Sequence, residues 1–175
     1  MITINSDGTV TGGTGGHGLR SPGSVVQTLS TTKTDAFSTN STSFVDITGL
    51  SVDITPTSTS SKVLVQFVIA CGNDAATQNR FELVRQVGGS DTSINPNEMD
   101  SSTAMFYVDA DGSNETYTRA QVAYNFLDSP STTDQVNYRL RTKIYSSSVN
   151  QYVNRAAYSS NTIGSSTITV MEIAA

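Results

Sequence analysis

The sequence has a single cysteine, a single histidine and no tryptophan, and these scarcities argue against several kinds of protein. One cysteine, Cys71, excludes an intramolecular disulfide framework. Cys71 lies among apolar residues with no histidine near it in the sequence, which favours a buried, inert thiol over a nucleophile. His17 lies in the stretch GGHGL, where no rigid element would hold it in catalytic geometry. We therefore expect a protein that is not an enzyme and needs no cofactor.

Charged residues are also scarce, at 14% of the chain against about 25% in an ordinary soluble domain. The net charge is −5 and the isoelectric point is near 4.6, whereas phosphate binding needs concentrated lysine and arginine. No apolar run approaches the roughly 20 residues that cross a bilayer. We therefore expect no nucleic-acid partner and no membrane partner.

Acidic residues offer only weak sites. Pairs such as Glu98 with Asp100 occur in any acidic, loop-rich chain, and no pair is singled out for hydrolysis of polysaccharide. The stretch DADGSNE at 109–115 has oxygen ligands at close spacing and is a candidate for Ca²⁺. Its glycine, however, is fourth in the stretch rather than sixth, as an EF-hand loop requires, so a plain Asp-Gly turn is favoured and no metal site is assigned.

Serine and threonine, 25 of each, take the place of the missing charges, and apolar residues alternate with polar ones nearly everywhere. Period-two alternation with polar turns and few helix signals predicts an all-β protein, a sandwich or barrel whose strand number suits a jelly-roll β-sandwich. The expected strands lie near 25–37, 44–55, 62–71, 80–87, 103–108, 116–127, 136–146, 151–158 and 165–174.

Two expected strands depart from the alternation, because both of their faces carry apolar residues. In KVLVQFVIACG the second face includes Leu64 and Val68, and in the closing TITVMEIAA it includes Met171 and Ile173. Loops covering the outer side would explain this pattern. The alternative is contact with other copies of the chain, since apolar surface beyond the core often marks an interface.

Two polar features have a structural and a functional interpretation. Arg139, Arg141 and Lys143 share one parity of a strand, either as a solvated outer face or as a basic stripe that faces an acidic partner. Tyrosine rings with nearby amide and guanidinium groups suit a sugar site, although tyrosine is common in sheets. The residues concerned are Asn150, Tyr152, Asn154, Arg155 and Tyr158.

The first 22 residues form an expected extended arm, and the sandwich is expected to span 23–175. Seven of the first 23 residues are glycine, so this segment loses much entropy on ordering and has little apolar surface to offset the loss. We therefore expect a partner surface to hold it. The glycines allow close backbone approach, Ile2 and Ile4 would add short strand pairing, and Val10 and Leu19 would be buried on the partner.

The stretches VVQTLSTTKTDAFSTNSTSFVDITGLSVDITPTSTSSKVLVQFVI, FELVRQVGGS, FLDSPSTTDQVNYRLRTKIYSSSVNQYVNR and ITVMEIA, spread over about 25–174, resemble small virion structural proteins and fibre-tip domains of tailed bacteriophages. The resemblance implies a jelly roll of the tumour-necrosis-factor type that associates as a homotrimer, and it brings no catalytic residues. Many fibre members carry a shaft or a longer attachment region, where this chain has only the Gly-rich arm.

The resulting hypothesis is a head-decoration or cement protein of the virion that binds the major capsid protein through its arm. Three arms per trimer would supply avidity that one weak arm lacks. The alternative is a tail-fibre or receptor-binding head, whose partners would be other tail proteins or a host glycan.

Overall fold

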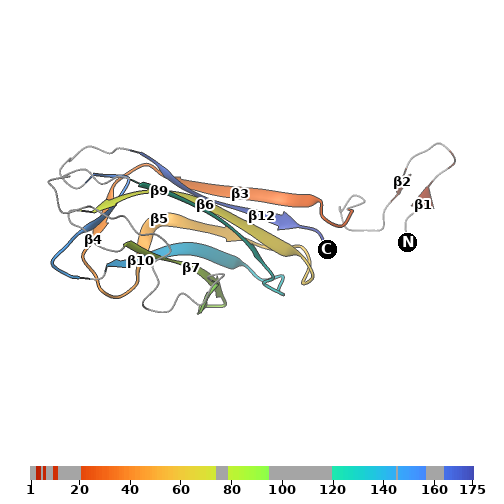
Figure 1. Ribbon diagram of the computed structural model, residues 1–175. Coiled ribbons are helices and arrows are strands. Elements are labelled where there is room, and N and C mark those ends of the chain that lie inside the picture. The colour runs from red at the N-terminus through yellow and green to blue at the C-terminus, as the bar shows by residue number, and fades with distance from the viewer. Residues whose placement is uncertain are drawn as a thin grey trace.

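The computed structural model describes residues 3–4, 6, 10–11, 21–73, 79–94, 120–144, 146–156 and 164–175, and every regular element among them is a β-strand (Figure 1). The strands of the N-terminal half are β1 (Thr3–Ile4), β2 (Val10–Thr11), β3 (Val25–Lys33), β4 (Phe37–Thr39), β5 (Val45–Ile54) and β6 (Lys62–Asn73). Those that follow are β7 (Asn79–Val87), β8 (Ser90–Ser93), β9 (Ala120–Asp128), β10 (Val136–Ile144), β11 (Gln151–Val153) and β12 (Ser166–Ile173).

The strands from β3 onward form two antiparallel sheets that pack face to face (Figure 1). One has four strands in the order β5-β10-β7-β8. The other has six, in the order β3-β12-β6-β11-β4, with β9 also paired to β6. The predicted β-sandwich is thus confirmed. The jelly-roll connectivity stays a prediction, because the expected strand at 103–108 and the rest of 95–119 lie outside the described residues.

The core lies between the two sheets and follows from the alternation in the sequence. In β10 every second residue is buried, from Val136 to Ile144, while the residues between them are half-buried. In β6 the inward set is Val63, Val65, Phe67 and Ile69, each at most 2% exposed. Burial of such side chains contributes about 1.5–3 kcal/mol each, so this apolar layer is the main source of stability.

Two strand boundaries differ from expectation. The first expected strand, at 25–37, is broken between Lys33 and Phe37, because the buried Asn154 side chain donates hydrogen bonds to the carbonyl oxygens of Lys33 and Asp35 at 2.9 and 3.1 Å. These bonds satisfy the carbonyl groups at the bend. Before the bend β3 pairs with β12, and after it β4 pairs with β11. The strand expected at 151–158 is correspondingly short.

Strand β8 was missed, although the sequence contains its signal. Gly88 and Gly89 have φ values of 55° and 82°, and they join β7 to β8 as a two-residue hairpin. Positive φ at both central residues is the requirement of a type I′ turn, which glycine meets without strain. The pair in VGGS therefore predicts the hairpin.

A bulge at Gly49 brings one carboxylate onto the outer face of the four-stranded sheet. The pairing of β5 with β10 shifts between Arg139, opposite Ser51, and Arg141, opposite Asp46. Gly49 has a φ of 85°, which accommodates the extra residues. As a result Asp46 reaches both arginines.

The chain before residue 21 contributes the short pair β1–β2, in which Ile4 lies opposite Val10. Among the described strands these two pair only with each other. The sandwich begins where the Gly23 N–H donates to the Ala174 carbonyl at 2.7 Å and the Ala174 N–H donates to Ser24 at 2.9 Å. The predicted division at residue 22 coincides with this start, but whether 1–22 acts as an arm remains a prediction.

Two buried carboxylates join elements at the margins of the core. Asp128 of β9 accepts a hydrogen bond from the Tyr138 hydroxyl at 2.7 Å and is ion-paired with Arg85 at 2.9 Å, which connects the two sheets. Burial, followed by the hydrogen bond to Asp128, raises the pKa of Tyr138. The phenol therefore remains a donor over the whole working pH range.

Glu172 of β12 is fully buried and holds the loop that follows β5. Its Oε1 accepts hydrogen bonds from the backbone N–H and the hydroxyl of Thr57, both at 2.7 Å, and its Oε2 accepts one from Gln27 at 2.7 Å. Burial alone would raise the pKa of Glu172, but hydrogen bonds from Gln27, Thr57 and Ser61 outweigh it and hold the pKa below the ordinary value of 4.5.

This arrangement predicts a pH-dependent effect of Glu172→Gln. Because the folded-state pKa is lowered, the carboxylate stabilises the fold above the ordinary glutamate pKa, and this contribution is lost as the pH falls through the folded-state value. At about pH 7 the variant should lose about 2 kcal/mol in urea unfolding, as expected for hydrogen bonds to a charged group. The difference from the wild type should shrink on acidification; a gap that stays constant down to about pH 2.5 would contradict the assignment.

Candidate functional site

The two outer faces of the sandwich differ sharply in charge. The outward residues of β9, β6, β12 and β3 form what we call the uncharged face. It comprises Gln121, Ala123, Asn125 and Leu127 of β9, Leu64, Gln66 and Val68 of β6, Thr167, Thr169, Met171 and Ile173 of β12, and Val25, Thr28, Ser30 and Thr32 of β3. None of these residues is ionisable, and Lys62 at the start of β6 lies at the border.

Apolar side chains of the uncharged face lie side by side across the strands. Leu64 is opposite Leu127 of β9 on one side and Met171 of β12 on the other, and Ile173 is opposite Val25 of β3. The exposed fractions are large, at 50% for Leu127 and 55% for Val25. A connected apolar row of this kind on a sheet surface is typical of an interaction surface.

The polar residues of the uncharged face bond to one another. The hydroxyls of Ser30 and Thr169 are 2.8 Å apart, and the Gln66 amide donates to Asn125 at 3.1 Å. Side chains paired in this way lose few hydrogen bonds when water is removed from them. The face is therefore suited to burial against another surface.

The structure brings the four predicted interface residues onto this one face. Leu64, Met171 and Ile173 are half-buried and Val68 is 40% exposed. Contact with other copies remains a prediction. Leu127 was missed, although it has the parity opposite to Val122 and the other inward residues of AQVAYNFL, which is a sufficient signal.

Of the predicted arm residues, Ile4 lies in β1 and Val10 in β2, and the two are register partners. Ile2 and Leu19 lie outside the described residues. The anchoring role of all four remains a prediction.

The outer face of the four-stranded sheet carries the predicted basic stripe, whose two arginines are ion-paired within the chain. Arg139 is ion-paired with Asp46 at 3.1 Å and with Asp91, while Arg141 lies 3.3 Å from Asp46. The ammonium of Lys143 lies 4.6 Å from the centre of the Phe44 ring. Paired arginines attract an acidic partner much less than free ones do, which weakens the partner-facing interpretation without testing it directly.

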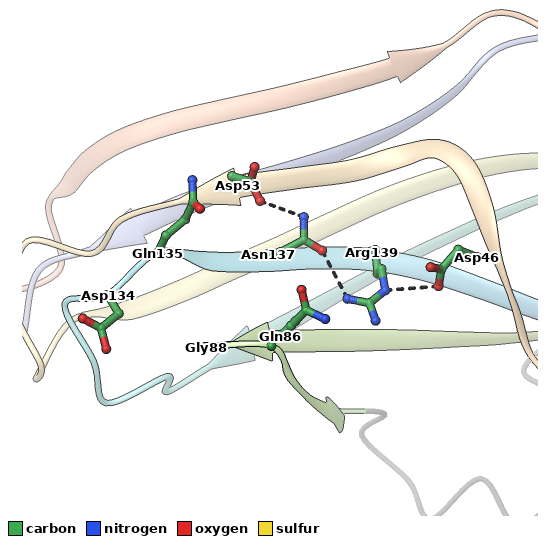
Figure 2. A pocket seen from close by; sticks show the side chains of 9 residues that line it. Asp46, Asp53, Gln86, Gly88, Asp134, Gln135, Asn137 and Arg139 are labelled. Atoms are coloured by element: carbon green, nitrogen blue, oxygen red, sulfur yellow. Dashed lines mark hydrogen bonds and ion pairs between the residues drawn. The ribbon is translucent and has the colours of Figure 1, made fainter.

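A polar groove opens on this charged face at the end where β7 turns into β8 (Figure 2). Its volume is about 600 Å³. Asn137 and Arg139 of β10 lie between Asp53 and Asp46 of β5 on one side and Gln86 of β7 on the other (Figure 2). The turn at Gly88 and Gly89 and the loop residues Asp134 and Gln135 complete the lining.

Arg139 in the groove and Asp91 beside it favour each other's charged forms. The hydrogen bond from Arg139, followed by that from Gln86, lowers the pKa of Asp91. Burial alone would lower the pKa of Arg139, but hydrogen bonds to Asp91 and Asp46 outweigh it and raise the pKa. The network therefore stays charged at neutral pH.

Of the two interpretations left open for the tyrosines near β11, the sugar site is contradicted at Tyr152 and Asn154. Tyr152 is 8% exposed and the Arg155 guanidinium lies 4.7 Å from its ring centre, which leaves no open ring face for a sugar. Asn154 is fully buried, and its amide is used by the backbone at 33–35. Asn150 keeps a partly exposed position, and Tyr158 lies outside the described residues. The sequence could not reveal that the turn folds inward.

Of the other candidate groups, only Cys71 lies among the described residues. Cys71 is 1% exposed, as expected. His17, Glu98, Asp100 and the stretch at 109–115 lie outside the described residues. Within the described part of the chain there is no group of three or more His, Cys, Asp or Glu side chains that could hold a metal ion, and no helix long and apolar enough to span a membrane.

Comparison with models of known protein families and with curated proteins gives no match to this chain.

The placement of Cys71 predicts a thiol that does not react in the native protein. Burial raises its pKa to about 12, so at about pH 8 only about one molecule in ten thousand carries the thiolate. Ellman's reagent should label the native protein no faster than it unfolds, and should label the urea-unfolded chain at once. Rapid labelling of the folded protein would contradict the buried position.

Proposed function

We propose that this chain is a non-enzymatic structural protein of a bacteriophage virion. It forms a homotrimer through the uncharged face and binds the major capsid protein through residues 1–22, as a head-decoration or cement protein. The observation that carries the proposal is the uncharged face, because a surface of this composition has a physical reason to be buried in an assembly.

The uncharged face favours a second copy of the chain as its occupant. The protein has a net charge of −5, so two copies repel each other wherever their acidic surfaces approach. The uncharged face is where like-charge repulsion is smallest, and charge depletion with apolar enrichment is the composition of interface cores. The number of copies, three, is drawn from the resemblance to phage jelly rolls.

Attachment through residues 1–22 is supported by chain composition. The glycines let the backbone follow an existing surface, and the pairing of Ile4 with Val10 gives a short β-segment that can add to a strand of the capsid protein. A single short segment binds weakly, whereas three segments fixed to one trimer bind with avidity.

A tail-fibre or receptor-binding head is the second candidate, and the polar groove on the charged face favours it. In that case the surface of the sandwich, rather than residues 1–22, would carry recognition of other tail proteins or a host glycan. The two candidates share the virion as location and the trimer as assembly, and differ in the partner.

Light scattering tests the assembly. The wild type should have a mass of about 55 kDa, three times the 18.5 kDa of the chain, and Val68→Asp should be a monomer. An unpaired charge in a dry interface costs about 3–5 kcal/mol, enough to dissociate the trimer. Ser51→Asp, at an exposed strand position of the opposite face, is the control and should stay trimeric. A wild type that remains monomeric at high concentration would refute the assembly.

Co-sedimentation with undecorated capsids tests the attachment. The full chain should bind, whereas residues 23–175 should keep the wild-type melting temperature and lose binding, because the contact with the shell is deleted three times per trimer. A full-length variant with Ile4→Ser and Val10→Ser separates the role of these side chains from that of length. Equal binding of all forms would assign attachment to the sandwich, and binding of host cells in place of capsids would favour the receptor-binding head.

A further inference from the structure

The polar groove on the charged face has the features of a site for a neutral saccharide, and we propose that it binds one. The inference starts from its shape. The groove is open along one side and, at about 600 Å³, has room for a ligand of a few sugar rings. It lies at one end of the four-stranded sheet, where side chains of β5, β10 and β7 meet the β7–β8 turn and the loop at 134–135, so rigid strands hold much of its lining (Figure 2).

The lining side chains are planar hydrogen-bonding groups, and neighbouring groups orient them. Asn137 donates to Asp53 at 2.7 Å and accepts from Arg139 at 3.4 Å. Gln86 donates to Asp91 at 2.8 Å. Because these bonds orient the amides before a ligand binds, little side-chain entropy is lost on binding.

The remaining hydrogen-bonding capacity defines the ligand. Besides the atoms in the hydrogen bonds above, each of these amide and carboxylate groups has a further acceptor atom or donor proton. The groove therefore presents adjacent donors and acceptors. A hydroxyl both donates and accepts, and neighbouring hydroxyls of a sugar ring match a carboxylate beside an amide. Charge-assisted bonds from hydroxyl to Asp53 would be the strongest contacts.

Charge disfavours an anionic ligand in the groove. The lining includes Asp46, Asp53 and Asp134, while the nitrogens of its single guanidinium, Arg139, already contact Asp46, Asp91 and Asn137. A phosphate or sulfate would meet carboxylates without a free cation. The carboxylates form no metal-holding group among the described residues. A neutral ligand rich in hydroxyls fits both conditions.

The groove and the uncharged face lie on opposite sides of the sandwich. If copies associate through the uncharged face, which rests on the proposed function, each groove remains open to solvent. One groove would bind a single saccharide end with a dissociation constant in the millimolar range. The three grooves of one trimer would together bind a surface that displays many saccharide ends much more tightly. Binding in a single groove does not depend on this assembly.

The test uses nuclear magnetic resonance on the full chain with four named probes, maltotriose, cellotriose, chitotriose and mannotriose. At least one should shift the side-chain amide signals of Asn137 and Gln86 at millimolar concentration. Asn137→Ala should weaken binding about tenfold, which is the effect of one ordinary hydrogen bond. Asn125→Ala, the same substitution on an exposed strand of the uncharged face, should leave the affinity unchanged.

Any other binding result overturns the saccharide proposal. No shift with any of the four probes, or shifts outside the groove, would show that the groove does not bind saccharide. Shifts of the same signals by calcium chloride alone would make it a cation site, and shifts by a sulfated oligosaccharide but not by the neutral probes would make it an anion site. A monomeric protein that binds a probe would refute the proposed trimer while leaving the groove intact.

Discussion

The structure depends on one strand, β6, which is central in its sheet and carries apolar residues on both faces. It pairs with β9 along one edge and with β12 and then β11 along the other, so all but its ends are inside a sheet. Its inward side chains are the centre of the core, and no charged residue occupies its outward side between Leu64 and Val68. The inward side chains of β6 therefore stabilise the core, while apolar side chains such as Val68 remain exposed on the outer face.

Two buried carboxylates make specific polar contacts at the margins of this apolar centre. Asp128 and Glu172 lie at or near the ends of β9 and β12, where each accepts hydrogen bonds from backbone or side-chain donors. Each is costly to bury alone and is stabilised by several donors. Specific polar contacts thus fix the ends of a sandwich whose middle is held by nondirectional burial.

The two outer faces of the sandwich differ in the chemical groups that they present. Most ion pairs among the described residues lie on the four-stranded sheet, where the Gly49 bulge brings Asp46 to Arg139 and Arg141. The six-stranded sheet presents hydroxyls, amides and apolar groups. One face therefore has few charges to desolvate, and the other presents oriented polar groups. This separation underlies both the proposed assembly and the proposed saccharide site.

The alternation in the sequence determined the sandwich, the positions of its long strands and the residues of the core, because period two assigns each side chain to one side of a strand. It also predicted that Leu64, Val68, Met171 and Ile173 point away from the core. The sequence did not determine the groove, since Asp53, Gln86 and Asn137 are brought together by pairing between strands that are distant along the chain. Nor did it show that Tyr152 and Asn154 are buried, because burial of a turn depends on what packs over it. Contacts between distant segments are decided by register and bulges, and only the tertiary structure supplies those.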